Sequence, residues 1–239
     1  MKKLLTAASL TFLLCVYAQS SVPVQDMSPD ALALEYYGLL NGQNTLNDDK
    51  SVLAMHMMRL HYSPAPTLRL SLGVGNSNFY VDQKVRCQTG FSLSAGAALF
   101  VPNIHPLISL TTGFDSYYVS GSSAEARSVG ILNVPYAGVI IHMSEFVDLE
   151  IGGSYQFFDL QKRHPDDPAI TTSIEEQIRI YSSLTLHDPE SGVYLSGGLS
   201  SSTNQQKLDR KTFPTNTSVW FQFGIILKQD KETANSSEW

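Results

Sequence analysis

Hydrophobic and polar residues alternate along most of this chain, and the alternation is clearest between residues 172 and 199. On the first arm of this stretch Ile178, Ile180 and Leu184 share one parity, and polar residues fill the other. The alternation stops at residues 188–192 and then resumes. Because successive side chains of a strand point to opposite faces, the stretch is predicted to be a hairpin with one apolar and one polar face. Its first arm exceeds the usual strand of about five or six residues, which favours a membrane-spanning barrel, whose strands need roughly 9–11 residues.

Similar alternation elsewhere predicts ten strands in all. They span residues 31–40, 52–62, 68–75, 89–101, 107–118, 129–142, 147–157, 172–187, 193–200 and 218–227. The first has an alternative, because its Ala, Leu and Glu residues would also suit a helix, and eight strands would remain if the sixth is also misread. That sixth strand alternates irregularly and contains Pro135, which cannot donate to a strand ladder. We therefore expect a bulge there.

The connections between the predicted strands alternate in length. Tight turns are expected at residues 63–66, 102–106, 143–145 and 188–191, and longer polar connections at residues 41–50, 76–88, 119–128, 161–171 and 203–216. Strict alternation places all the long loops at one end, which is typical of outer-membrane barrels with short periplasmic turns. The predicted fold class is therefore all-β: an antiparallel up-and-down transmembrane β-barrel, with ten strands expected and eight as the alternative.

Aromatic residues gather near the ends of the predicted strands. Pairs of them adjoin the long connections: Phe79 with Tyr80, Tyr117 with Tyr118, Phe157 with Phe158, and Trp220 with Phe221. Transmembrane barrels carry aromatic girdles at both membrane interfaces, so we expect these pairs to lie there. The alternative is that aromatic residues are simply common in strands.

The amino terminus has the features of a secretory signal peptide. Lys2 and Lys3 precede an apolar run over residues 4–17, and Ala18 stands where a signal peptidase would cut. The predicted division of the chain is a signal peptide (1–18), a polar lead-in (19–30), the barrel (31–227) and a polar carboxy-terminal tail (228–239). Removal of the signal would leave Cys87 as the one cysteine, too few for an internal disulfide.

Composition narrows the expected partners and cofactors. Charged residues make up 16% of the 239 residues, below the roughly 25% of an ordinary soluble domain. The net charge of −6, with no basic cluster, argues against nucleic acid as a partner. The sequence has no Cys/His cluster with zinc spacing and no nucleotide-binding or hydrolase motif, so neither a metal site nor a cofactor is predicted.

In this pattern of strands and turns, over residues 31–227, the chain resembles the small bacterial outer-membrane β-barrel proteins as a class. The last predicted strand, residues 218–227, has the aromatic and apolar character that the outer-membrane assembly machinery commonly recognises in that class. The resemblance implies that the protein is located in the bacterial outer membrane. It also implies outer-membrane lipid and the assembly machinery as partners.

The polar face of the predicted barrel carries charges of both signs. The set expected to point into the lumen is Arg59, Arg69, Asp115, Asp148, Glu150, Glu175 and Arg179. An unpaired charge is costly in a confined interior, so we expect these side chains to neutralise one another and plug the lumen. The predicted function is that of a non-enzymatic envelope protein, either structural or binding through its loops.

Two alternative functions are left open. Asp148 and Glu150 share the polar face and would suit acid–base chemistry, so the first alternative is a narrow outer-membrane channel or a barrel enzyme using lumen or rim carboxylates. The second is a soluble exported barrel or sandwich that binds a partner, because a period of two cannot say which face meets lipid. Against the second, the polar face is rich in Gly, Ser and Thr, whereas a soluble surface would be dense in Lys and Glu.

Overall fold

The computed structural model describes residues 29–44, 50–81, 87–123, 127–164, 167–202 and 217–227, without the side chains of residues 42–44, 50–51, 80–81, 103, 162–164 and 167–175. Ten strands account for nearly all of this part of the chain. In chain order they are β1 (Ala31–Asn44), β2 (Lys50–Ala65), β3 (Leu68–Val81), β4 (Gln88–His105), β5 (Ile108–Ser122), β6 (Arg127–Ser144), β7 (Val147–His164), β8 (Asp167–His187), β9 (Val193–Ser202) and β10 (Thr217–Leu227). The predicted signal peptide and carboxy-terminal tail lie outside the described residues, so these boundaries stay predictions.

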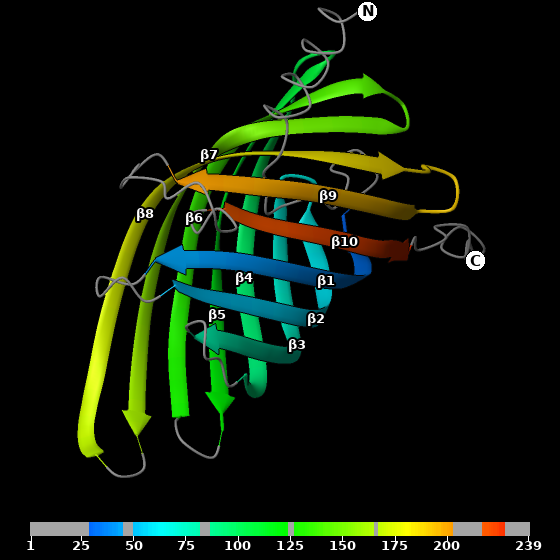
Figure 1. Ribbon diagram of the computed structural model, residues 1–239. Helices are drawn as coiled ribbons and strands as arrows, with labels where there is room; N and C mark the ends of the chain where they lie inside the picture. The colour runs from blue at the N-terminus through cyan, green and yellow to red at the C-terminus, as the bar shows by residue number, and fades with distance from the viewer. Residues whose placement is uncertain are drawn as a thin grey trace, which may run out of the picture.

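The strands close into a barrel (Figure 1). Each strand pairs antiparallel with its neighbours in sequence, and β1 also pairs with β10, from Leu32 opposite Leu227 to Asn41 opposite Ser218. This closed ten-stranded meander confirms the predicted fold class, and residues 31–40 are strand and not helix. Among the residues that the structure describes, no helix is long and apolar enough to cross a membrane.

Several strands are longer than the alternation predicted, and the connections at one end of the barrel are correspondingly shorter. β3 continues to Val81, into the region predicted as a long loop. β7 ends at His164 and β8 begins at Asp167, so most of the predicted connection 161–171 is strand. Polar residues dominate these extensions, and without an apolar face they lack the alternation that predicts a strand. The segment 203–216, between β9 and β10, remains the longest connection.

β6 accommodates Pro135 without the predicted bulge. Its register against β5 is continuous through this residue. Against β7 the ladder stops after Asn133 and resumes in the same register at Tyr136, so no extra residue is inserted. The register shift lies instead between His142 and Ser144, next to the turn. The irregular hydrophobic pattern has another cause, because β6 carries apolar side chains on both of its faces.

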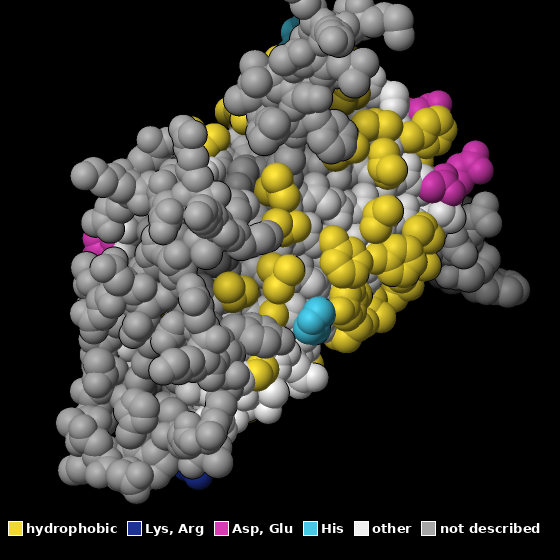
Figure 2. All heavy atoms as spheres, in the orientation of Figure 1, with side chains coloured by type: hydrophobic (Ala, Val, Ile, Leu, Met, Phe, Trp, Pro, Cys, Tyr) yellow, Lys and Arg dark blue, Asp and Glu magenta, His cyan; other side chains and the backbone are white. Residues whose placement is uncertain are grey.

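The outer face of the barrel is apolar. Leu72 on β3, Phe223 on β10 and Leu195 on β9 are 65%, 53% and 47% exposed. Each of the remaining strands also has large hydrophobic side chains on this face. Figure 2 shows hydrophobic side chains gathered over β1, β2 and β10, with acidic side chains at the margin of the visible surface. On β9 and β10 the side chains on this outer face are exposed at Leu195, Phe221, Phe223, Ile225 and Leu227 and half-buried at Leu199. Such a belt is typical of a barrel surrounded by lipid.

Candidate functional site

The interior of the barrel is filled by side chains, and many of them are apolar. One contiguous cluster of buried hydrophobic residues projects inward from most of the strands. Its largest members are Tyr37, Leu39, Leu53, Met55, Met57, Phe79, Phe100, Tyr117, Leu132, Tyr136, Ile140, Phe158, Leu160, Tyr181 and Trp220. We call this set the lumen core. The lumen is therefore less polar than the sequence predicted.

One member of each predicted girdle pair belongs to the lumen core. Phe79, Tyr117, Phe158 and Trp220 are each at most 4% exposed, so they do not lie at the membrane interface as predicted. The physical reason is the alternation of strand side chains, which lets only one of two adjacent aromatics face lipid. Glycine makes room for them: a Cβ at Gly198 would collide with the indole ring of Trp220.

Side chains from distant strands meet inside the barrel. Tyr37 on β1 stacks on Tyr117 on β5, with ring centroids 6.1 Å apart and ring planes 17° apart. β1 and β5 are four positions apart around the barrel. The guanidinium of Arg59, from β2, lies 4.9 Å from the centroid of the Tyr37 ring. At this level the lumen is crossed by side chains.

Arg59 is the centre of a buried polar cluster. Its guanidinium lies 3.3 Å from Oδ1 of Asp115 and 3.7 Å from Oε1 of Glu35. Glu35 lies 3.3 Å from Nε2 of His61 and accepts a 2.9 Å hydrogen bond from the hydroxyl of Tyr194. All five residues are at most 3% exposed, and we call them the Arg59 cluster. Contacts between opposite charges offset the cost of burying each charge alone.

Arg59 and Asp115, which both belong to the predicted set of lumen charges, are in direct contact. Arg69 lies with its guanidinium 4.6 Å from the centroid of the Phe100 ring. Six of the seven are buried: Arg59, Arg69, Asp115, Asp148, Glu150 and Arg179. The side chain of Glu175 lies outside the described part of the chain.

Arg179 and Glu150 also have uncharged hydrogen-bond partners. Nη2 of Arg179 donates a 2.7 Å hydrogen bond to the amide oxygen of Gln177, and Nη1 donates to one serine hydroxyl on β9 and another on β10. Glu150 accepts a 3.3 Å hydrogen bond from the hydroxyl of Tyr181. The pairing of all seven charges in one network stays a prediction.

Glu35, His61 and Tyr194 were missing from the predicted set. Glu35 stands directly opposite Arg59 in the β1–β2 ladder. Its parity, opposite to that of the apolar residues around it, was a signal, but the helical alternative for residues 31–40 hid it. His61 lies two residues after Arg59, so the alternation of strand side chains also places it on the polar face. Only the closure of the barrel brings Tyr194 to Glu35, and no sequence pattern reveals that contact.

A second polar cluster lies at the end of the barrel where the turns are short. Oγ of Ser109 lies 2.7 Å from Nε2 of His142, and Nδ1 of the same ring lies 2.8 Å from Oδ1 of Asp148. Nε2 of His187 lies 3.5 Å from Oδ2 of Asp148. The four residues come from β5, β6, β7 and β8, each close to a turn, and all are buried. Asp148 therefore contacts two histidines that the sequence reading did not single out.

The described residues offer no site for a metal ion, since no group of three His, Cys, Asp or Glu side chains among them is suitably arranged. His56 and His61 lie on opposite faces of β2, and Nδ1 of His56 lies 2.7 Å from the hydroxyl of Tyr36 on the outer side. Cys87 is an exposed free thiol just before β4, in the connection predicted for it.

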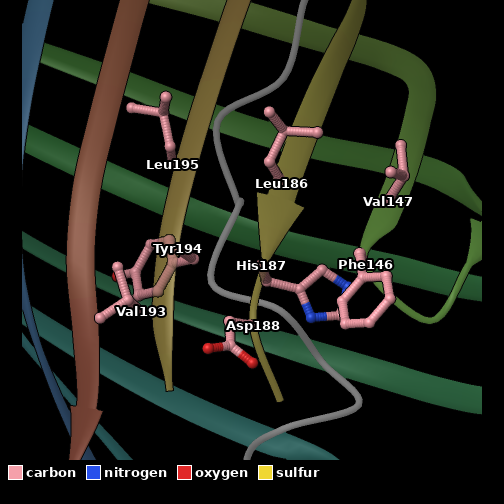
Figure 3. Close-up of a pocket in the computed structure, with 8 residues that line it drawn as sticks. All are labelled: Phe146, Val147, Leu186, His187, Asp188, Val193, Tyr194 and Leu195. Carbon is pink, nitrogen blue, oxygen red and sulfur yellow. The ribbon is translucent and has the colours of Figure 1, made fainter. Parts of the chain in front are cut away.

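A hollow of about 280 Å³ lies beside the turn between β8 and β9. Figure 3 shows the imidazole of His187 beside the ring of Phe146, and the backbone N–H of His187 donates a 2.9 Å hydrogen bond to the Phe146 carbonyl. The other walls are mostly apolar. Asp188, at its rim, accepts a hydrogen bond from the backbone N–H of Glu190, which ties its carboxylate to the turn. The hollow therefore lacks the convergent polar groups of a ligand site.

No protein-family model matches this chain. No curated protein matches it either. Among solved structures, the translocator domain of the autotransporter NalP from Neisseria meningitidis matches with a TM-score of 0.50 and 10% identity, over 85% of this chain and 90% of that one. The outer membrane protease OmpT from Escherichia coli gives a TM-score of 0.43 and 13% identity, over 85% and 97% of the two chains. The transport unit of the autotransporter AIDA-I from Escherichia coli gives 0.47 and 8%, over 87% and 93%.

At these identities the likeness concerns the fold alone. The chain has the fold of bacterial outer-membrane β-barrels, as its closed sheet and apolar outer face show independently. This fold agrees with the predicted location in the outer membrane.

Proposed function

We propose that this chain is an outer-membrane β-barrel whose lumen is filled by side chains. On this proposal it serves as a structural protein or binds a partner through the connections at one end of the barrel, and it does not conduct ions. The apolar outer face supports contact with lipid, because transmembrane barrels present such a belt to the bilayer. On this proposal its partners are outer-membrane lipid and the machinery that inserts barrels. The longest connection, 203–216, is the first place to look for a binding role.

The observation that carries the proposal is the meeting of side chains across the lumen. Tyr37 reaches Tyr117 from β1 to β5, and Arg59 reaches Asp115 from β2 to β5. A barrel of about this size has an interior just wide enough for side chains to fill. With the lumen core at one level and the Arg59 cluster at the next, a path for hydrated ions along the barrel axis would require these contacts to break.

Conductance in planar bilayers tests the proposal. The full chain is refolded in detergent, checked for a heat-modifiable shift in gel mobility, and reconstituted. We expect no unitary conductance steps, because the lumen core excludes water. A Tyr37→Ala, Tyr117→Ala double variant removes the stacked pair, and its leak should exceed that of the parent. Stable, long-lived open channels in the parent protein would refute the filled lumen and favour the narrow-channel alternative.

The remaining alternatives fit the structure less well. If the barrel were soluble, apolar side chains such as Leu72 and Phe223 would be exposed to water all around it. A contiguous apolar surface of that extent marks contact with lipid or with a partner. An acid–base enzyme that used Asp115 or Glu150 would need a carboxylate free for substrate. Asp115 is already paired with Arg59 at 3.3 Å, and Glu150 stands opposite Ile140 of the lumen core in the β6–β7 ladder. The structure thus favours a barrel whose interior side chains stabilise the fold.

A further inference from the structure

Three residues at the short-turn end of the barrel form a continuous hydrogen-bonded chain. Ser109 on β5, His142 on β6 and Asp148 on β7 come from consecutive strands. The two distances, 2.7 Å from the serine Oγ to Nε2 and 2.8 Å from Nδ1 to the aspartate Oδ1, use both ring nitrogens of the histidine. We call these three residues the turn-end triad. It shares no residue with the Arg59 cluster.

The order of atoms in the turn-end triad has a chemical consequence. A carboxylate accepts a hydrogen bond only from a protonated ring nitrogen, so Asp148 fixes the proton of a neutral His142 on Nδ1. Nε2 is then an acceptor and takes its hydrogen bond from the hydroxyl of Ser109. A serine bonded to a histidine that is oriented by a carboxylate is the arrangement that activates a hydroxyl for attack on an acyl carbon.

A second observation at the same place concerns Thr111. It lies two residues beyond Ser109 on the same inward face of β5 and is 3% exposed. Its hydroxyl has no hydrogen-bond partner among the described residues. Phe100, its cross-strand neighbour, carries the guanidinium of Arg69 over its ring. A donor without a partner and a nearby positive charge are what a developing oxyanion requires.

The triad is the first inward layer at the mouth of the barrel. The side chains of His142 and Asp148 are each 7% exposed, and Ser109 is 2% exposed. Leu107 and Phe146, which lie two residues before Ser109 and Asp148, are 54% and 50% exposed. A molecule that reaches Ser109 must therefore enter from the short-turn end. Deeper entry is blocked by Ile140, which stands opposite Ser109 in the β5–β6 ladder and belongs to the lumen core.

We propose that Ser109 is a catalytic nucleophile for short-chain carboxylic esters, with His142 as general base, Asp148 as its positioning residue and Thr111 as an oxyanion donor. This activity is additional to the proposed structural or binding role and does not depend on it. We expect a short acyl group because Ile140 blocks the interior beyond Ser109.

The reaction balances with water as the only co-substrate. Oγ of Ser109 attacks the ester carbonyl carbon, and its proton passes to Nε2 of His142. The C–O bond to the alkoxide breaks, and the alkoxide leaves as an alcohol with that proton. Water then attacks the acyl-serine through the same base, and the proton it gave up returns to Oγ as the carboxylic acid departs.

The test is covalent labelling of the refolded full chain with a fluorophosphonate probe, with the labelled peptide identified by mass spectrometry. Label is expected on Ser109, and Ser109→Ala should abolish it. His142→Asn should slow labelling by about 100-fold or more. The matched control is Ser196→Ala, which removes another buried inward serine, one that is bonded to Thr185 instead of a histidine, and should leave the rate unchanged. Hydrolysis of p-nitrophenyl acetate should follow the same ranking, with Thr111→Val also slowed.

Three results would overturn the proposal. One is a folded parent protein that takes up no label, and another is label on a residue other than Ser109. The third is equal labelling of Ser109 in the parent and in a folded His142→Asn variant, which would make the hydrogen-bonded chain purely structural. If His142→Asn does not fold, the site and rate of labelling of the parent against its Ser196→Ala control decide the matter alone.

Discussion

The hydroxyl of Tyr194 on β9 donates a 2.9 Å hydrogen bond to Oε2 of Glu35 on β1, across the full width of β10. The two residues are 159 positions apart in the sequence, so this bond forms only when the barrel closes. Gly224 of β10 is the ladder partner of both residues. A Cβ at Gly224 would collide with the Tyr194 ring, so the glycine lets the phenol pass over the strand to reach the carboxylate.

Tyr194→Phe should therefore destabilise the folded barrel. The variant keeps the ring but removes a donor from a buried carboxylate, a loss worth about 1–3 kcal/mol. Urea unfolding in detergent micelles measures the change in the free energy of unfolding. Tyr118→Phe, at a half-buried tyrosine of β5, is the control and should change it little. Equal effects at the two positions would show that the Tyr194 bond contributes nothing specific.

Adjacent glycines on β9 should respond differently to the same substitution. A Cβ at Gly198 would overlap the Trp220 ring, whereas at Gly197 the nearest heavy atom would be the Trp220 carbonyl oxygen at 3.9 Å. Gly198→Ala overpacks the lumen core and should cost about 1–3 kcal/mol. Gly197→Ala should be neutral or slightly stabilising, because glycine weakens a strand interior. Thermal unfolding of the two variants makes the comparison, and a reversed order would mean that the strand phase is inverted.

The contact between Arg59 and Asp115 predicts a strong dependence of stability on pairing. Asp115→Asn leaves the guanidinium with only one carboxylate, Glu35, within 4 Å among the described contacts. Because removing one partner of a buried pair strands a charge, we expect a loss of about 3 kcal/mol. The double variant Arg59→Met, Asp115→Leu should lose less stability than Arg59→Met alone or Asp115→Leu alone. Strictly additive effects in this double-mutant cycle would contradict the coupling.

The strand pattern was readable from the sequence wherever only one face is apolar. In residues 193–200 apolar and polar positions alternate cleanly, and the structure has β9 there in the expected phase. In β2 and β6 both faces are apolar, because Leu53 and Val134 fill the lumen while neighbouring residues face outward. A strand with two apolar faces shows no hydrophobic–polar alternation, so the prediction of a bulge in β6 was wrong.

The polar contacts inside the barrel were only partly readable. Parity placed Arg59, Asp115 and Asp148 on one face, and all three are buried inside. Their partners depend on how strands curve around the lumen: Arg59 meets a residue of β5, three strands away, and Asp148 meets histidines beside two different turns. A period of two carries no information about contacts across a barrel.

The orientation of β10 predicts a depth-dependent cost for a charge on the outer face. Phe223, in the middle of the strand, is 53% exposed on that face. Phe223→Arg should destabilise the protein folded in lipid vesicles by about 2–4 kcal/mol. Leu227→Arg, at the strand end, should destabilise it by about 0–1 kcal/mol. Refolding into vesicles from urea measures both. Full tolerance of Phe223→Arg together with loss of folding in Ser196→Arg would show that the predicted phase of the strands is inverted. Gel mobility reports whether each variant folds.

Accessibility of a cysteine placed in the lumen core tests the filled lumen most directly. Met55 on β2 is fully buried, and Cys87 is an exposed thiol that serves as the reactive reference. The Met55→Cys change is made together with Cys87→Ser, and the folded protein in vesicles is treated with a charged methanethiosulfonate reagent. We expect no modification of residue 55 in the time that Cys87 of the parent reacts completely, and full modification after unfolding in urea. Modification of the folded protein at a rate comparable to that of Cys87 would show a water-filled lumen and contradict the account.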